Sequence, residues 1–289
     1  MEDAHHVHTA RGEATVGIYD GHGGPHAVNY VLEHLHRHIG TALEGGLAPT
    51  EALLSGFAQT EAGLVGEQRE QLCLTSAMCG ATATVALLRD CALHVAWLGD
   101  CRAVLCRGGD ALNLTHDHVL VGEGSCGEFL RVMSEGGHVE GGRLSGFLEV
   151  SRSLGDVDPR TGGKPAGLSS TPEICSQELQ PEDEFVIVAS DGLWRLVDSQ
   201  AAVRLARADL RAHANVDMAA EKLVEEARNT RRADDNITVG VLLLRPVEPD
   251  MSPGQRPKLQ LMRRGASFPS SLLQAASSAS VPSSPFIHA

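Results

Sequence analysis

The stretch that decides the fold is Asp20-Gly21-His22-Gly23-Gly24, which directly follows an apolar, strand-like run at residues 14–19. A predicted strand thus ends in a carboxylate, an imidazole and three glycines, and a turn of that composition can hold a metal ion. Two more aspartates occupy comparable places: Asp191 follows the apolar run 185–189, and Asp235 precedes the strand-like run 237–244. We therefore expect three strand ends to present three aspartates.

The ligand chemistry of these aspartates favours a hard divalent cation. Mg2+ and Mn2+ prefer oxygen ligands, and Mg2+ takes only one or two protein carboxylates while it keeps several waters. A structural zinc site would need closely spaced cysteine and histidine, whereas Cys101 and Cys106 have the wrong spacing and lack a second pair. The sequence predicts Mg2+ or Mn2+ rather than zinc.

Eight short motifs follow one another along the chain. They are Met1-Glu2-Asp3, Asp20-Gly21-His22-Gly23-Gly24, Gly80-Ala81-Thr82-Ala83, Gly99-Asp100-Cys101-Arg102, Glu135-Gly136-Gly137-His138-Val139, Val150-Ser151-Arg152-Ser153-Leu154-Gly155-Asp156, Ala189-Ser190-Asp191-Gly192-Leu193-Trp194 and Asp235-Asn236-Ile237-Thr238. In this order they resemble the PPM family, the metal-dependent protein serine/threonine phosphatases of type 2C. The resemblance covers most of the chain and implies an α+β fold. That fold is a β-sandwich of two antiparallel sheets flanked by helices, with a metal site at one end.

The resemblance also implies roles for the strand-end residues. Asp20 would bridge two metal ions, the Gly21 carbonyl would add a ligand to one of them, and Asp191 and Asp235 would complete the other. Two such ions about 3.5–4 Å apart lower the pKa of a water held between them, and the resulting hydroxide attacks phosphorus in line. The implied catalytic residues are Asp20 and His22, because His22 would act as the general acid that protonates the leaving Ser or Thr oxygen.

Further implied ligands lie outside this core. Glu2 would bind the second ion directly or through water, Asp3 would hold a metal-bound water, and Asp100 would belong to a third metal site. Arg195 departs from the family pattern, because many members have an Asp there that is associated with the third ion. Since a guanidinium repels a cation, we expect two bound ions, Mg2+ or Mn2+, and an impaired third site.

A second departure concerns the start of the chain. Family members usually carry an upstream strand and a phosphate-binding arginine, and this sequence has no counterpart before Met1. We therefore expect weakened phosphate binding, an open sheet edge, and mobile Glu2 and Asp3.

Three functions remain open on this basis. The intact Asp20, His22, Asp191 and Asp235 favour hydrolysis of phosphoserine and phosphothreonine on proteins. The missing arginine favours a catalytically weak or inactive phosphatase-like scaffold that binds signalling partners. A two-metal hydrolase of small phosphate esters or nucleotides would share the chemistry, but the sequence has no recognisable base-binding or basic groove.

Some other patterns have simpler interpretations. Cys101 and Arg107 have the Cys-x5-Arg spacing of cysteine-based phosphatases, but the residues between them lack a glycine-rich phosphate cradle. His34 and His38 lie four apart on a predicted amphipathic helix, where a solvated face is expected. The alternating histidines at positions 5, 6 and 8 indicate a strand with one polar face.

Length and composition indicate one large domain followed by a tail. The chain has 289 residues, 42% of them hydrophobic, and a net charge of −13, which argues against nucleic acid as a partner. No apolar run approaches bilayer length, the start does not resemble a signal peptide, and the seven irregularly spaced cysteines fit reduced thiols. We expect a monomer without membrane contact, in the cytoplasm or nucleus, whose partners are phosphorylated proteins.

The domain boundary is predicted from composition. Residues 1–245 would form the catalytic domain, without its first strand, and the Ser- and Pro-rich residues 246–289 would be a disordered tail. Apolar periodicity predicts helices at 25–39, 49–65, 127–135, 199–207 and 218–229, and strands at 82–88, 92–98 and 103–105. Adjacent strands joined by turns favour antiparallel pairing.

Overall fold

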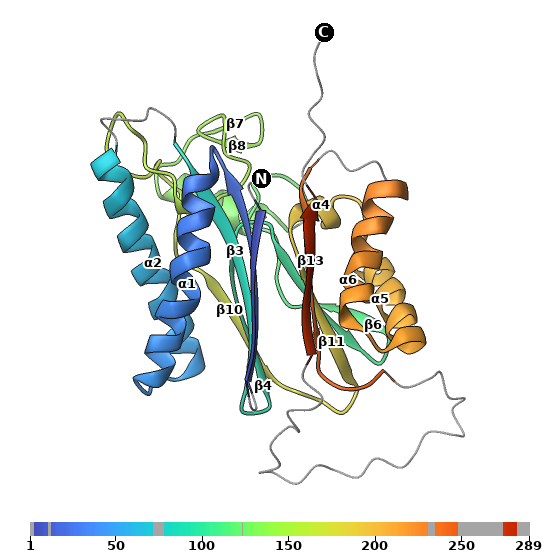
Figure 1. Ribbon diagram of the computed structural model, residues 1–289. Coiled ribbons are helices and arrows are strands. Elements are labelled where there is room, and N and C mark those ends of the chain that lie inside the picture. The colour runs from blue at the N-terminus through green and yellow to red at the C-terminus, as the bar shows by residue number, and fades with distance from the viewer. Residues whose placement is uncertain are drawn as a thin grey trace.

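The computed structural model describes residues 3–10, 13–71, 78–122, 124–230, 235–247 and 274–281 (Figure 1). Its helices are α1 (Pro25–Glu44), α2 (Pro49–Gln71), α3 (Cys126–Ser134), α4 (Asp191–Trp194), α5 (Ser199–His213) and α6 (Val216–Glu225), with a π-helical turn at Glu226–Thr230. No described helix is both long enough and apolar enough to cross a bilayer.

The first sheet contains the strand that carries Asp20, Gly21 and His22, which is β2. Its order is β1 (Asp3–Ala10), β2 (Glu13–His22), β3 (Gly80–Arg89), β4 (Ala92–Leu98) and β10 (Glu173–Glu178), all antiparallel, and β9 (Leu154–Gly155) pairs with β3. Small and β-branched residues keep β3 buried along almost its whole length, because layers pack against both of its faces.

The second sheet is assembled from strands distant in sequence. Its order is β13 (Gln274–Val281), β12 (Ile237–Leu243), β11 (Asp183–Ala189), β5 (Arg102–Arg107) and β6 (Asp110–Asn113), and every neighbouring pair is antiparallel. A separate short hairpin joins β7 (Val139–Glu140) to β8 (Arg143–Leu144).

Apolar side chains form a core between the two sheets and another on each outer face. Between the sheets, Val16 and Ile18 of β2 share a buried cluster with Val186 and Val188 of β11. On the outer face of the first sheet, α1 and α2 cover a second cluster (Figure 1). Burial of this apolar surface on both sides holds the sheets in register.

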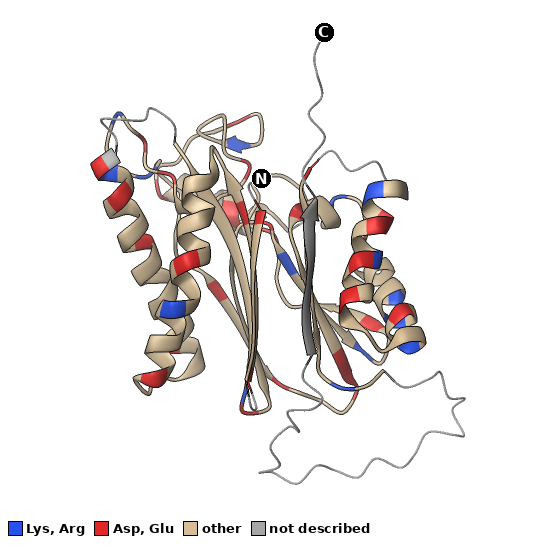
Figure 2. Ribbon diagram, in the orientation of Figure 1, with Lys and Arg blue, Asp and Glu red and all other residues tan. Residues whose placement is uncertain are grey.

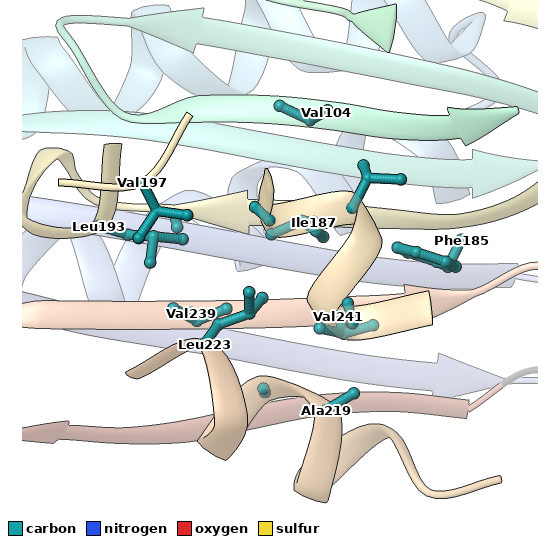
Figure 3. Packing of buried hydrophobic residues seen from close by; sticks show 14 of the residues in the cluster. Val104, Phe185, Ile187, Leu193, Val197, Ala219, Leu223, Val239 and Val241 are labelled. Carbon is teal, nitrogen blue, oxygen red and sulfur yellow. The ribbon is translucent and has the colours of Figure 1, made fainter. Parts of the chain in front are cut away.

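The third core lies on the outer face of the second sheet, where α4, α5 and α6 pack (Figure 3). Leu223 of α6 and Val239 of β12 belong to this cluster, as do Leu193 of α4 and Ile187 of β11. The α5 helix begins where the Asp198 side chain caps it by accepting from the Ala201 N–H at 2.8 Å. The sandwich and its flanking helices confirm the predicted fold class.

The predicted elements are present with shifted ends. The expected helix 25–39 extends to Glu44, and the expected helix 49–65 extends to Gln71. The strand predicted at 92–98 has those bounds, and the histidine-rich start is strand β1. The sequence pattern did not identify β6 or β10, because their few, mostly polar residues carry little periodic signal.

Two expectations about the ends of the chain differ from the structure. Strand β13 falls within the tail 246–289 that was predicted to be disordered, and it pairs with β12 through its backbone. Composition does not reveal such pairing, since an edge strand recruits backbone groups rather than large apolar side chains. Asp3, predicted to be mobile, is instead buried in β1 with its carboxylate hydrogen-bonded. Glu2 lies outside the described residues.

Candidate functional site

The strand-end aspartates meet at one end of the two sheets, where Figure 2 shows several acidic residues. Asp20 lies near the end of β2, Asp100 in the turn after β4, and Asp191 at the start of α4, directly beyond β11. One carboxylate oxygen from each of these three residues lies within 4.8 Å of the others, and we call this group the acidic cluster. Segments that are far apart in sequence therefore converge on one point.

Asp3 and Asp235 flank the acidic cluster in different ways. Asp3 stands opposite Asp20 in the β1–β2 register and accepts hydrogen bonds from Ser190 Oγ at 2.9 Å and Thr238 Oγ1 at 2.8 Å. Asp235 is more exposed and is not part of the three-carboxylate group. The structure thus groups Asp100 with the predicted core ligands Asp20 and Asp191, and Asp235 lies outside this group. Gly21 lies beside Asp20 within β2.

Burial and mutual repulsion make this site unfavourable for negative charge. Burial, followed by the charges of Asp3 and Asp191, raises the pKa of Asp20 well above its usual value. Burial, with Asp100 as the largest charged neighbour, raises the pKa of Asp191 to about 8. Such shifts mark carboxylates that lack enough positive charge nearby.

The donor set fits a divalent cation. Asp191 Oδ1 is buried and has no hydrogen-bond partner among the residues that the structure describes. Asp20, Asp100 and Asp191 supply only oxygen ligands, which suit Mg2+ or Mn2+. A cation at this point would satisfy the orphaned oxygen and offset the repulsion that raises the carboxyl pKa values.

Arg195, expected from the sequence only to repel a third ion, pairs directly with carboxylates of the site. Its guanidinium Nη2 lies 2.5 Å from Asp191 Oδ2 and 2.7 Å from Glu149 Oε2, and Nη1 lies 3.5 Å from Asp235 Oδ2. The expected conflict between Arg195 and a cation thus concerns the acidic cluster directly.

His22 lies beside the acidic cluster and has a buried acidic partner, Asp156. The His22 Nε2 atom is 2.9 Å and 2.8 Å from the two carboxylate oxygens of Asp156. Asp156 is fully buried and accepts a second hydrogen bond from Ser153 Oγ at 2.5 Å. The pair needs glycine at position 80, because a Cβ there would lie 2.1 Å from Asp156 Oδ2 and 2.6 Å from His22 Nε2.

Sequence reasoning assigned no role to Asp156, Ser190 or Thr238. All three stand inside motifs that the sequence analysis singled out, and those motifs were the available signal. Their contacts could not be read from the sequence, because 134 residues separate His22 from Asp156 and 235 separate Asp3 from Thr238.

A pocket of about 590 Å³ opens beside His22. Its other lining residues are largely apolar or belong to the loop after Asp156, and include Met78, Phe147, Leu148, Pro159 and Arg160. A second pocket of about 410 Å³ adjoins Asp100, Asp191 and Arg195. The acidic cluster is therefore reachable from the surface.

A second group of potential ligands, His116, His118 and Glu173, does not fit a metal ion. His118 Nδ1 accepts the Gly99 N–H at 3.1 Å, and burial lowers the pKa of His118 to about 3. The neutral ring therefore carries its hydrogen on Nε2, the atom that would have to bind the metal. Arg152 Nη2, 2.7 Å from Glu173, adds an opposing positive charge.

Comparison with known proteins gives the family and the fold. The family model described as protein phosphatase 2C matches residues 1–237. The chain is 38% identical over 242 residues to Probable protein phosphatase 2C 22 of Arabidopsis thaliana, covering 82% of this chain and 60% of the relative. It is 37% identical over 251 residues to Probable protein phosphatase 2C 57 of Oryza sativa subsp. japonica, covering 86% and 66%. The chain thus spans 60–66% of the length of these relatives.

Solved structures share the architecture at lower identity. A C. elegans sex determining protein superposes with a TM-score of 0.72 at 23% identity, covering 85% of this chain and 62% of that one. A serine-threonine phosphatase 2C from Toxoplasma gondii superposes with a TM-score of 0.64 at 22% identity, covering 83% and 93%. These two similarities support the fold. The family model and the curated relatives, which match over most of the sequence, show that this chain belongs to the protein phosphatase 2C family.

Proposed function

We propose that this chain is a metal-dependent protein phosphatase that hydrolyses phosphoserine and phosphothreonine. The observation that carries the proposal is the acidic cluster, where burial and mutual repulsion raise the pKa of Asp20 and Asp191, next to the His22–Asp156 pair. Membership of the protein phosphatase 2C family supports a metal-dependent reaction of this class.

The proposed ligands are Asp20, Asp191 and Asp100, with Asp235, Glu2 and the Gly21 carbonyl completing the set. Mg2+ or Mn2+ held there would activate water and neutralise phosphate charge. Asp3 would hold a metal-bound water rather than bind the metal itself, since Ser190 and Thr238 hold its carboxylate next to Asp20. Fixed second partners of this kind orient ligands and preserve their geometry.

His22 is proposed as the general acid. Asp156 orients its imidazole through Nε2 and stabilises positive charge on the ring. When water attacks phosphorus, the bond to the Ser or Thr oxygen breaks, and His22 delivers the proton that this oxygen needs. The pocket beside His22 would receive neighbouring residues of the substrate.

Hydrolysis of a phosphothreonine peptide tests this function. With Mn2+ the purified chain should turn over, EDTA should abolish turnover, and Asp191→Ala should lower it by at least about 100-fold. His22→Gln should lower it by about 100-fold, while the matched change His26→Gln, four residues further along the chain in α1, should have little effect. A folded chain that binds Mn2+ but releases no phosphate would contradict the proposal.

A second candidate, a phosphatase-like scaffold without turnover, is favoured by one observation. Arg195 already pairs with Asp191 and Asp235, which reduces their capacity to bind a metal ion. The scaffold predicts no Mn2+ binding and no effect of EDTA. The same titration and assay therefore separate the two candidates.

A further inference from the structure

Arg195 connects three acidic side chains from separate segments. It follows α4, so that its guanidinium reaches back one turn to Asp191, across to Asp235 before β12, and outward to Glu149 in the loop between β8 and β9. Its backbone N–H is fixed by the Asp191 carbonyl at 2.8 Å. The backbone of Arg195 is thus anchored, while its side chain is 51% exposed and has room to change partners.

The contacts of Arg195 compete directly with metal coordination. A guanidinium donates through five N–H groups and stays charged at any ordinary pH. At 2.5 Å from Asp191 Oδ2, it occupies an oxygen of a proposed metal ligand. Two cations this close near a protein surface repel each other strongly, because the effective dielectric constant there is well below that of bulk water. Simultaneous contact of Arg195 and a divalent cation with Asp191 is therefore opposed by strong electrostatic repulsion.

Glu149 is an alternative ion-pair partner for Arg195 when Arg195 no longer pairs with Asp191. Its carboxylate Oε2 already lies 2.7 Å from Arg195 Nη2, and its other oxygen pairs with Arg143 of β8. Glu149 is not one of the proposed metal ligands, so an arginine paired only with Glu149 would leave Asp191 and Asp235 available. Both carboxylates between which Arg195 would exchange, Asp191 and Glu149, are thus already in contact with it.

We propose that Arg195 is a tethered counter-cation that competes with the divalent cation for Asp191 and Asp235, and that Glu149 accepts it when the metal binds. This inference rests on the metal site of the proposed function. It deepens that function, because the balance between two contacts of one arginine would set the metal affinity of this chain.

Calorimetric titration with Mn2+ tests the competition without using activity. Arg195→Met should bind Mn2+ about tenfold more tightly, since the competing cation is gone, which corresponds to about 1.4 kcal/mol. Glu149→Gln should bind it several-fold more weakly, because Arg195 then has a poorer alternative to Asp191. Opposite effects from two neighbouring variants are difficult to obtain from altered folding.

Arg143→Met is the matched control. Arg143 lines the same pocket and is similarly exposed, but its acidic contact is Glu149 and not the acidic cluster. Its removal should change Mn2+ affinity by no more than about twofold, as expected of an exposed charge. If Arg143→Met tightened binding as much as Arg195→Met, general charge would explain the effect and the proposal would be overturned.

The melting temperature in EDTA supplies a second readout. Arg195→Met should melt a few degrees lower than the parent, because the acidic cluster loses its counter-cation, and saturating Mn2+ should remove most of the difference. If neither the parent nor Arg195→Met bound Mn2+, the proposed metal site would be overturned and this inference with it. A parent that binds Mn2+ with the same affinity as Arg195→Met would overturn this inference alone.

Discussion

Glu128 and the acidic cluster are both buried acidic groups, but their charges are balanced in opposite ways. Glu128 in α3 lies 2.7 Å from Arg131 Nη2 and 2.6 Å from Arg152 Nη2, and it accepts a hydrogen bond from Ser151 Oγ at 2.5 Å. Burial alone would raise the pKa of Glu128, but these donors hold it well below its usual range. In the acidic cluster, by contrast, the pKa values of the carboxyl groups are raised.

The difference separates a structural charge from a functional one. Every oxygen of Glu128 has donors from the chain itself, so this carboxylate joins α3 to the loop that carries Ser151 and Arg152. Among the residues that the structure describes, the acidic cluster has an oxygen without a hydrogen-bond partner, and its Asp191 pairs with the half-exposed Arg195. A folded chain retains such strain where a ligand is to supply the missing charge.

Removal of the Glu128 charge should have the largest effect on stability. Glu128→Gln leaves Arg131 and Arg152 without their shared buried partner and should lower the free energy of unfolding by about 3 kcal/mol. Urea denaturation measures the change. Glu135→Gln, which removes the exposed partner of Arg131, is the control and should cost well under 1 kcal/mol. Equal losses of unfolding free energy in Glu128→Gln and Glu135→Gln would show that the buried Glu128 charge is worth no more than an exposed one.

Asp156 is a buried carboxylate whose partner is a histidine, His22, rather than the arginines that pair with Glu128. Gly80→Ala should force the pair apart and lower turnover of a phosphothreonine peptide by about 100-fold. Turnover of an aryl phosphate, whose leaving oxygen needs no proton, should fall much less in the same variant. Gly66→Ala is a matched control, because a Cβ there meets nothing within 4 Å. Equal losses on both substrates would argue against a proton-transfer role.

Neutralisation of Asp191 should stabilise the metal-free chain. Its pKa is raised to about 8 in the folded state and is about 3.8 when unfolded, so its contribution to stability is present below pH 4 and is lost as pH rises towards 8. In EDTA at pH 8, Asp191→Asn should therefore be more stable than the parent by about 2 kcal/mol, with a smaller difference at pH 5. Denaturation curves at the two pH values measure this, and parallel pH profiles would refute it.

An exposed ion pair should matter least. Arg37 Nη1 lies 3.4 Å from Glu33 Oε1 on α1, with both side chains about 60% exposed. Arg37→Ala should change the free energy of unfolding by less than about 0.5 kcal/mol, because water screens the pair. A larger loss in urea denaturation would show that burial does not decide the value of charges in this fold.

Local signals in the sequence predicted several elements of the fold. The apolar run before Asp191 predicted the end of β11, and Pro25 predicted the start of α1. The run before Asp20 predicted β2, but this strand continues two residues beyond Asp20, to His22, where it pairs with β3. Local signals failed where the outcome depended on partners distant in sequence. Asp3 was expected to be mobile, but Ser190 and Thr238 hold it in place, and the tail was expected to lack the strand that pairs with β12.

The sequence by itself determined which residue types stand at the strand ends, because turns, caps and periodicity act over a few residues. It also predicted the family, through motifs in a preserved order. Only the tertiary structure decided which charged groups pair. Asp156 pairs with His22, Arg195 pairs with Asp191 and Glu149, and two arginines pair with Glu128. The physical reason is that electrostatic energy depends on distance and burial in space, and folding brings together groups that lie in separate segments, such as His22 and Asp156, 134 residues apart.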